Sequence, residues 1–373
     1  MQAVRVRVSK SKNRKPIKVV GNPIHTVRVR VSKEYNVKIG ANLLTTLGQE
    51  AAALIKGRRA ALVSDSNVWP LYGEVAETSL KDAGFTVSSF VFPHGEASKN
   101  GETYLRLLEF LAENQITRTD CLIALGGGVV GDMTGFAAAT YLRGVSYIQV
   151  PTTLLAMVDS SVGGKTAIDL PAGKNLAGAF CQPVVVLCDI QTLDTLPEEI
   201  FRDGCAEVIK YGVLYDEELI AELYHKGIAF DRQKVIAQCV AHKRNVVEAD
   251  EFDTGDRQYL NLGHTVGHAI EKASNYSVSH GRAVAIGICI VARSVVKDKI
   301  ANGFDCEWIV ETIKRVGLPT TTDIPPEILA QNALSDKKRQ DDFIRVIAPD
   351  HVGECWPHSV FVDQLPDFIK RGI

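Results

Sequence analysis

Short apolar runs alternate with segments of helical periodicity through residues 57–190. The runs lie at Ala60–Val63, Val87–Phe92, Cys121–Leu125, Tyr147–Val150 and Val184–Cys188. Alternation of this kind predicts a mainly parallel sheet with helices on its faces, because parallel strands are joined by crossover helices. This half of the chain therefore predicts an α/β domain of the Rossmann-like type.

The strand signals nearly stop after residue 197, and the rest of the chain has a helical pattern. The expected helices cover residues 198–223, 234–248, 259–274, 282–298, 306–316 and 327–334, and only Phe343–Ile347 resembles a strand. We therefore predict a basic extension at 1–24, the α/β domain at 25–200 and an all-α domain at 201–373. A ligand cleft is expected where the two domains meet.

The heptapeptide Val-Arg-Val-Arg-Val-Ser-Lys occurs twice, at residues 4–10 and 27–33. Both copies alternate with the period of a strand. The second copy leads directly into Tyr35 and the domain, so we expect it to form the first strand. The region before it is rich in Lys, Arg and Ser, and we expect a mobile extension with solvated charges.

Three glycines follow the apolar run 121–125 and lead into a helical pattern over residues 129–140. Gly126, Gly128 and Gly131 have the spacing G-x-G-x-x-G that dinucleotide-binding turns use. Glycines let the backbone turn sharply and approach an anion, while the first N–H groups of the helix point at it. This stretch is a candidate site for the phosphates of a nicotinamide cofactor.

The acidic residue that usually binds the cofactor ribose is not where this motif places it. The next strand ends in Pro-Thr-Thr at residues 151–153. Asp65, which follows an earlier apolar run, could take that role instead. On spacing alone, a dinucleotide site and a purely structural glycine turn both remain open.

The segment 164–166, Gly-Lys-Thr, resembles the end of a phosphate-binding P-loop, but the first glycine of that motif would fall on Asp159. The P-loop interpretation therefore fails. Asp159, Lys165, Lys174 and Asn175 are polar residues separated by small ones. This pattern is typical of a lined pocket, and a solvated loop with ordinary lysines is the alternative.

Five residues of the helical half have side chains suited to metal or acid–base chemistry: Glu207, Lys210, His264, His268 and His280. Residues four apart on a helix share a face. Spacing alone therefore selects His264 and His268 as a ligand pair. A carboxylate from elsewhere would complete a zinc site with an open position for substrate.

Composition limits the remaining classes of function. The chain has 373 residues, 46% of them hydrophobic and 23% charged, with a formal net charge of −2. These values give no electrostatic case for binding nucleic acid or an anionic membrane, and the apolar run 283–292 is too short to span a bilayer. Eight scattered cysteines without a C-x-x-C pair indicate small buried hydrophobes in a reducing, cytoplasmic location. The first 33 residues contain no acid, which leaves an organellar transit peptide open.

Seven ordered segments carry a family resemblance. They are ALGGGVVGD at 124–132, FAAATYLRG at 136–144, PTTLLA at 151–156, DSSVGGKT at 159–166, GKNLAGAF at 173–180, AEVIKYG at 206–212 and NLGHTVGHAIE at 261–271. Together they closely resemble 3-dehydroquinate synthase, from about residue 25 to the end of the chain. The resemblance implies a dehydroquinate synthase-like fold and conversion of 3-deoxy-D-arabino-heptulosonate 7-phosphate to 3-dehydroquinate and phosphate. It further implies a cycle in which NAD is reduced and then regenerated.

The resemblance also implies a divalent metal, with zinc preferred and cobalt as the alternative, bound by Glu207, His264 and His280. His280 thus takes the place of His268 in the ligand pair that spacing selects, because His268 matches a position in the substrate site. Asp159 matches a position beside metal and cofactor. The matched substrate positions are Lys165, Asn175, Lys210, Lys243, Arg257, Asn261 and one or both of Lys337 and Lys338. Arg143 matches an arginine that reaches the neighbouring subunit's site, which implies a homodimer.

For NAD, the resemblance implies that Asp65 supplies the acid missing after the second strand of the motif. The matched positions are Asp65, Asn67, Glu96, Lys99, Gly127, Gly128, Asp132, Thr152, Thr153, Lys174, Thr195 and Leu196. Two positions depart from the family pattern: Arg282 stands where Glu is usual, and Ile200 where an acid is common. Three alternatives stay open: another sugar phosphate cyclase, a metal-dependent alcohol or glycerol dehydrogenase, and an inactive scaffold.

Overall fold

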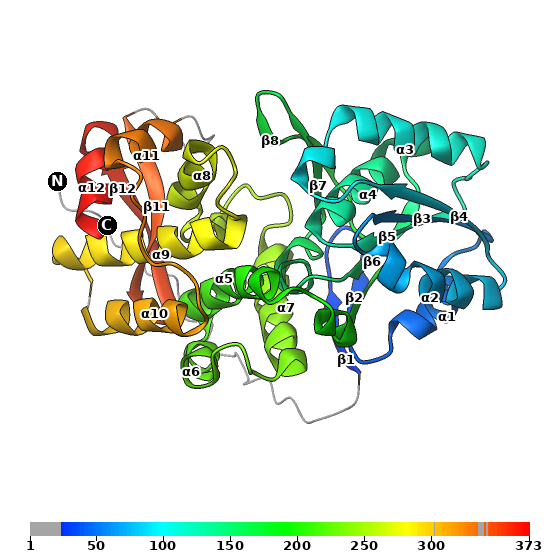
Figure 1. Cartoon of the computed structure of the whole chain (residues 1–373), viewed down its shortest axis with the longest axis horizontal. Coiled ribbons are helices and arrows are strands. Elements are labelled where there is room, and N and C mark those ends of the chain that lie inside the picture. Colours follow the sequence, from blue (N-terminus) through cyan, green and yellow to red (C-terminus); the bar gives the residue numbers. More distant parts are fainter. Residues whose placement is uncertain (1–23, 302, 335–338, 341) are drawn as a thin grey trace. The chain divides into compact units, whose positions relative to one another are not determined.

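The computed structural model describes residues 24–301, 303–334, 339–340 and 342–373. These residues group into two compact units (Figure 1). The amino-terminal unit comprises 24–197 together with 232–253, and the carboxyl-terminal unit comprises 198–231 together with 254–373. The predicted extension at 1–24 lies almost wholly outside the described residues.

A seven-stranded sheet forms the centre of the amino-terminal unit, in the order β1-β2-β9-β6-β5-β3-β4. All neighbouring strands are parallel except β1, which pairs antiparallel with β2. The five predicted apolar runs are confirmed as parallel strands, and the second heptapeptide contributes to β1. The strands are β1 (His25–Val29), β2 (Tyr35–Gly40), β3 (Arg59–Asp65), β4 (Thr86–Phe92), β5 (Cys121–Gly126), β6 (Ser146–Pro151) and β9 (Val185–Asp189).

Helices cover both faces of this sheet, which explains why its strands are apolar at consecutive positions. Leu62 and Ile123 pack with α1 and α2 on one face, whereas Val63 and Leu122 pack with α3 and α4 on the other. The helices are α1 (Leu47–Leu54), α2 (Trp69–Asp82), α3 (Gly101–Glu113), α4 (Gly128–Thr140) and α7 (Arg232–Ala249). The predicted division at residue 200 assigns α7 to the carboxyl-terminal half, whereas its contacts group it with the amino-terminal unit.

An antiparallel hairpin, β7 (Lys165–Leu170) and β8 (Gly173–Phe180), occupies the segment expected to be a lined pocket or a solvated loop. The sequence does not predict these strands, because β8 is rich in Gly, Lys and Asn, which are uncommon in strands. A Cβ atom on Gly178 would lie 2.1 Å from the carbonyl oxygen of Thr166. Glycine is therefore required here for the two strands to approach.

The carboxyl-terminal unit is mainly helical, as predicted, but it also contains a sheet of order β10-β11-β12. Its helices are α5 (Glu198–Tyr215), α6 (Glu217–Lys226), α8 (His264–Ala273), α9 (His280–Lys297), α10 (Gly303–Arg315), α11 (Pro326–Ala333) and α12 (Leu365–Gly372). Its strands are β10 (Arg339–Gln340), β11 (Phe343–His351) and β12 (Glu354–Phe361). The helix expected at 198–223 is interrupted at Asp216, whose side chain accepts a hydrogen bond from the N–H of Leu219 and caps α6.

Helix α9 is the centre of the carboxyl-terminal unit because it is apolar around most of its circumference. Ile290 and Val295 are fully buried and pack in one cluster with Phe368 of α12 and Val346 of β11. The run 283–292 is therefore the core of a folded unit. Within the described ranges, no helix is both long and apolar enough to cross a membrane.

Candidate metal and cofactor sites

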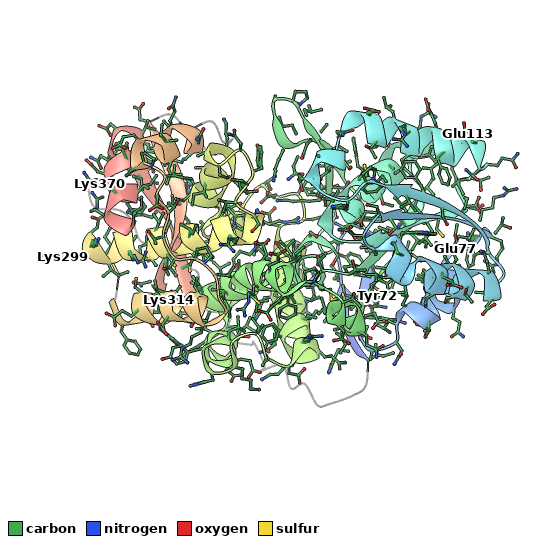
Figure 2. All side chains as sticks on the ribbon, in the orientation of Figure 1. Tyr72, Glu77, Glu113, Lys299, Lys314 and Lys370 are labelled. Carbon is green, nitrogen blue, oxygen red and sulfur yellow. The ribbon has the colours of Figure 1, made fainter. Side chains whose placement is uncertain are left out.

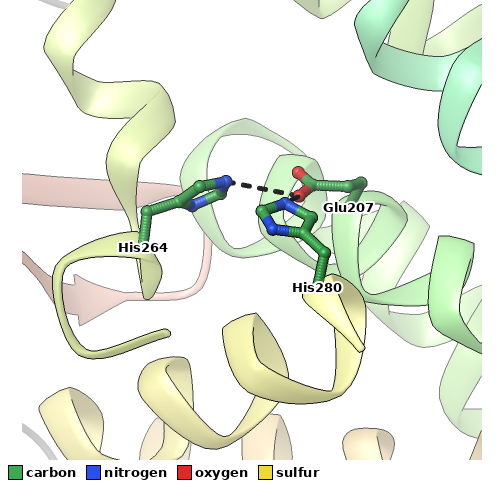
Figure 3. A group of neighbouring side chains, drawn as sticks. All are labelled: Glu207, His264 and His280. Atoms are coloured by element: carbon green, nitrogen blue, oxygen red, sulfur yellow. Dashed lines mark hydrogen bonds and ion pairs between the residues drawn. The ribbon is translucent and has the colours of Figure 1, made fainter. Parts of the chain in front are cut away.

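Three side chains that can bind a metal converge in the carboxyl-terminal unit. Glu207 comes from the middle of α5, while His264 and His280 are the first residues of α8 and α9. Oε1 of Glu207 lies 3.3 Å from Nε2 of His264 and 3.2 Å from Nε2 of His280 (Figure 3). All three ligand atoms fit within 4.8 Å of one another.

The other nitrogen of each imidazole contacts an acceptor that fixes the ring. Nδ1 of His264 lies 2.9 Å from the carbonyl oxygen of Leu262, and Nδ1 of His280 lies 3.1 Å from Oε2 of Glu271. When Nδ1 carries the proton and donates, the lone pair of Nε2 is left for a metal. Two imidazoles and one carboxylate with oriented Nε2 atoms fit a catalytic zinc site that keeps a position for substrate.

Small residues explain how three helices bring these side chains together. Gly263 has φ of +76°, and a Cβ atom on it would lie 2.7 Å from the carbonyl oxygen of Val284. A Cβ atom on Gly287 would lie 2.1 Å from the carbonyl oxygen of Gly263, and one on Gly281 would lie 1.9 Å from that of Asp203. The glycines therefore allow α8 to approach α9, and α9 to approach α5, closely enough for the ligands to meet.

Charge around Glu207 is balanced by Lys210, one turn further along α5. Nζ of Lys210 lies 2.5 Å from Oε2 of Glu207, and both side chains are almost fully buried. Among the described residues, this oxygen accepts no hydrogen bond, so the contact is an ion pair rather than an aligned hydrogen bond. Burial by itself would raise the pKa of Glu207, but Lys210 and the two histidines outweigh burial and hold the pKa well below its usual value.

The two histidines of the cluster have pKa values displaced in opposite directions. Burial lowers the pKa of His264 to about 4, although Glu207 acts in the other direction. Burial also acts to lower the pKa of His280, but hydrogen bonds to Glu207 and Glu271 outweigh burial and raise the pKa to about 10. Two carboxylates thus favour a positive charge at His280, and the same surroundings suit a divalent cation.

The pair that spacing selects does not occur in one ligand group of the described residues. The rings of His264 and His268 have centroids 5.5 Å apart, but His268 groups with Glu271 and the other side of His280. The ring centroids of His264 and His268 lie 5.2 Å and 6.0 Å from that of His280, so both histidines adjoin the same ring but belong to different ligand groups. Spacing along one helix could not reveal this, because the decisive neighbours come from other helices.

The remaining candidates of this unit lie just before α8. Arg257 and Asn261 belong to a 3-10 segment, Asp256–Asn261, and the Arg257 side chain is only 2% exposed. A buried guanidinium is costly unless it is paired. Lys337 and Lys338 lie outside the described residues.

The candidate NAD residues gather at the carboxyl edge of the seven-stranded sheet. Asp65 ends β3, Gly127 follows β5 and Thr152 follows β6, and these strands are neighbours in the order β3-β5-β6. The chain leaves β3 towards β4 on one side and then crosses to β5 on the other side. The reversal makes the β3–β5 edge a topological switch point, where open α/β sheets bind ligands.

The glycine turn after β5 has the close approach that anion binding needs. Gly127 precedes α4, and the start of this helix has no side-chain cap. A Cβ atom on Gly127 would lie 3.1 Å from Cγ2 of Thr153, and one on Gly131 would lie 2.6 Å from Oε1 of Gln149. The turn is thus packed against the end of β6, and the first N–H groups of α4 are left for an anion.

Two polar groups at this edge have capacity left for a ligand. Oδ1 of Asp65 accepts hydrogen bonds from the N–H groups of Asn67 at 2.8 Å and Val68 at 3.0 Å. Oδ2 of Asp65 accepts no hydrogen bond from the described part of the chain. The hydroxyl of Thr152 is buried and likewise has no partner among those residues. An unsatisfied buried hydroxyl and a half-used carboxylate fit the hydroxyl groups of a nucleotide.

Lys99 connects the remaining NAD candidates to a predicted substrate residue. Its buried Nζ donates to Oδ2 of Asp132 and to Oδ1 of Asn175, both at 2.6 Å, and lies 3.8 Å from Glu96. Burial acts to lower the pKa of Lys99, but Asp132 and Glu96 outweigh burial and raise the pKa. Lys174 adjoins Glu96 at 4.0 Å. These residues form one charged network between α4, β8 and the turn after β4.

Five more candidate site residues of this unit lie at three other places: Asp159 with Lys243, Lys165, and Thr195 with Leu196. On α7, Lys243 donates to the carbonyl oxygen of Asp159 at 2.7 Å and forms an ion pair with its carboxylate. Lys165 is exposed and forms an ion pair with Asp253. Thr195, beside Leu196, lies 2.5 Å from the hydroxyl of Tyr72, which is labelled on α2 in Figure 2.

Both parts of one family match this chain. A model described as 3-dehydroquinate synthase N-terminal matches residues 89–203, and one described as 3-dehydroquinate synthase C-terminal matches residues 204–339. The chain belongs to the 3-dehydroquinate synthase family. A 3-dehydroquinate synthase of Pelobacter propionicus is 43% identical over 342 residues, which cover 89% of this chain and 94% of that relative.

Two solved structures share the fold of this chain. A 2-deoxy-scyllo-inosose synthase complexed with carbaglucose-6-phosphate, NAD+ and Co2+ has a TM-score of 0.84 at 24% identity, covering 94% of this chain and all of that one. ValA, a 2-epi-5-epi-valiolone synthase from Streptomyces hygroscopicus with NAD+ and Zn2+ bound, has a TM-score of 0.82 at 23% identity, covering 95% and 98%. These two structures confirm the predicted fold class, and the family models confirm the predicted family.

Glu271 is the principal residue of the site that sequence analysis missed. It is 3% exposed and lies on α8, one turn after His268. The sequence signal for Glu271 is an acidic residue on the buried face of a helix that also carries a histidine. This signal does not identify Glu271 as a site residue, because only the fold places His280 beside it.

Proposed function

We propose that the chain is a carbon–oxygen lyase that converts 3-deoxy-D-arabino-heptulosonate 7-phosphate into 3-dehydroquinate and phosphate. NAD and a divalent metal, with zinc preferred over cobalt, are its proposed cofactors. The observation that carries the proposal is the convergence of Glu207, His264 and His280 in a chain that matches both parts of the 3-dehydroquinate synthase family. The reaction has no net oxidation, because substrate and products contain the same atoms and electrons.

The cofactors would supply chemistry that side chains cannot: a bound divalent metal polarises a hydroxyl oxygen, and NAD holds a hydride until it is returned. The three ligands would leave an open position for the substrate hydroxyl. Lys210 keeps Glu207 as a carboxylate. Leu262 and Glu271 orient the two rings.

The cations that match substrate positions of the family support a substrate with an anion at each end. We propose that Lys165, Asn175 and His268 contact the phosphate, while Lys243 and Arg257 contact the carboxylate. Asn261, Lys337 and Lys338 complete the proposed set. Binding at both ends would keep the intermediate in place until the hydride returns and the ring closes, because remote contacts restrict the reacting carbons.

The proposed NAD site uses the switch point of the sheet. Asp65 and Asn67 would bind the ribose hydroxyls, and Gly127, Gly128 and the N-terminus of α4 would bind the phosphates. The remaining proposed contacts are Glu96, Lys99, Asp132, Thr152, Thr153, Lys174, Thr195 and Leu196.

A homodimer is also proposed, in which Arg143 reaches the site of the neighbouring subunit. Arg143 is exposed and lies on a turn with φ of +65°, next to Leu142 with φ of +51° and 40% exposure. Two consecutive non-glycine residues with positive φ are strained. A projecting arginine on a strained, partly apolar turn supports a role in contact with a second chain.

Two histidines one turn apart provide the test of the metal assignment. His264→Ala should remove the bound metal and abolish turnover, because one of three ligands is lost. His268→Ala should keep the metal and lose turnover, because it affects only the phosphate contact. Elemental analysis of both purified variants measures this. A His264→Ala protein with one metal per chain and normal turnover would contradict the proposal.

A further inference from the structure

His280 belongs to two groups of side chains that can hold a cation. It forms an inner group with Glu207 and His264, and an outer group with His268 and Glu271. In each group the ligand atoms lie within 4.8 Å of one another. All of these residues belong to the carboxyl-terminal unit. The imidazole of His280 is therefore common to both groups.

The two groups differ in their access to solvent. In the inner group, Glu207 is fully buried and His264 is only 8% exposed. In the outer group, His268 is partly exposed, and the side chain of the shared His280 is 32% exposed. A cation that arrives from solvent therefore has access to His268 and His280 before it reaches the buried inner ligands.

The outer group has the ligand chemistry of a metal site. His268 and Glu271 are three residues apart on α8, so their side chains share one face of the helix. Oε2 of Glu271 lies 3.1 Å from Nδ1 of His280. Two imidazoles and one carboxylate are the same set of donors as in the inner group, and this set suits zinc.

Each ring nitrogen of His280 faces one carboxylate. Nδ1 adjoins Glu271, and Nε2 lies 3.2 Å from Oε1 of Glu207. A neutral imidazole has one N–H and one lone pair, so it binds one cation at a time. When Nδ1 binds the cation, the N–H at Nε2 donates to Glu207. When Nε2 binds it, the N–H at Nδ1 donates to Glu271. Both arrangements therefore leave each ring nitrogen with a partner.

We propose that the outer group is an entry site from which a divalent cation passes to the inner group. This inference rests on the metal site of the proposed function and adds the route by which that site is filled. The cation binds the outer group first and then exchanges it for the inner group, while His280 changes the nitrogen that it offers. The inner position is the stable one, because a cation and a carboxylate attract each other more strongly where water is excluded.

Removing one inner ligand isolates the outer group. His264→Ala leaves all three outer ligands in place, so it should bind one Co2+ per chain in equilibrium dialysis and release it on gel filtration. His264→Ala/His268→Ala should bind Co2+ about tenfold or more weakly, because loss of even an outer-shell partner costs about 10- to 100-fold in metal affinity. If His264→Ala does not fold, His264→Asn gives the same comparison, because its amide can still donate to the carbonyl oxygen of Leu262.

The matched control is His225→Ala, because His225 is exposed on α6 and belongs to neither group. His264→Ala/His225→Ala should bind Co2+ as His264→Ala does. If the residual binding came from Glu207 and His280 alone, adding His268→Ala would leave it unchanged, and the entry site would be overturned.

The rate of metal loading provides the second measurement. The metal-free full chain is mixed with Co2+ in a stopped-flow instrument without substrate, and visible absorbance follows the filling of the inner group. His268→Ala should load several-fold more slowly than the wild-type and His225→Ala proteins and reach the same final absorbance. Equal loading rates would overturn the entry site. A wild-type chain that binds no Co2+ would instead overturn the metal site of the proposed function.

Discussion

Nδ1 of His280 lies 3.1 Å from Oε2 of Glu271, while Nε2 of the same ring lies 3.2 Å from Oε1 of Glu207. The ring is therefore held between two buried carboxylates on different helices. Glu207 is the proposed ligand, and Glu271 is a positioning residue that acts through the imidazole. Such partners set the tautomer and orientation of a metal-binding histidine.

Removing the charge of Glu271 should weaken metal binding without removing a ligand. Glu271→Gln keeps the size of the side chain but replaces a carboxylate oxygen with a weaker acceptor. We expect a loss of metal affinity of about 10- to 100-fold, measured by competition with a chromophoric chelator. Glu307→Gln on α10 is the matched control, because Glu307 is exposed and far along the chain from the cluster.

The same pair of variants separates positioning from a general loss of stability. Unfolding in denaturant should give Glu271→Gln and Glu307→Gln similar midpoints when metal is in excess. An unchanged metal affinity in Glu271→Gln would show that Glu271 does not position the ring.

Asp65 allows the proposed ribose contact to be separated from a structural one. Oδ1 accepts from Asn67 and Val68, and asparagine can keep this cap while losing the charge. We expect Asp65→Asn to raise the Kd for NAD by about tenfold or more, since a hydrogen bond to a charged group contributes ~1.5 to 3 kcal/mol. Calorimetric titration with NAD measures the Kd. Unchanged affinity would exclude Asp65 from the cofactor site.

The contact between α8 and α9 depends on Gly287. A Cβ atom there would lie 2.1 Å from the carbonyl oxygen of Gly263, so Gly287→Ala should cost about 1 to 3 kcal/mol of unfolding free energy. Gly303→Ala on α10 is the control, because its Cβ atom would lie 3.7 Å from the nearest atom. Chemical denaturation compares the two. Equal stability of both variants would show that the helices can move apart without cost.

Most of the sheet was predictable from sequence because each parallel strand is buried on both faces. Leu62 and Val63 face opposite helical layers, so both must be apolar, and the strand appears as a continuous run. The hairpin of β7 and β8 was not predictable, because strands were recognised by runs of apolar residues. In β8, glycine takes such a position, since Gly178 is needed for the two strands to approach closely. Strand β12 was missed as well, since its sequence mixes Pro357 and His358 with apolar residues.

The metal site shows which information is local and which is not. The three ligands come from α5, α8 and α9, and their meeting depends on glycines whose contacts are 20 or more residues away in sequence. Helical spacing could relate His264 only to His268, on the same helix. The family resemblance identified His280 as a ligand because matched positions in related proteins already reflect which residues meet in the folded structure.

The measurement that tests the central claim most directly follows phosphate and NADH in one reaction. The protein is mixed with NAD, a divalent metal and 3-deoxy-D-arabino-heptulosonate 7-phosphate, and phosphate is assayed while absorbance reports NADH. We predict phosphate release over many turnovers without net NADH, because the hydride returns before product leaves. Stoichiometric accumulation of NADH without phosphate would contradict the lyase account and favour a metal-dependent dehydrogenase. Phosphate release only from a sugar phosphate that lacks the carboxylate would also contradict it, in favour of another sugar phosphate cyclase.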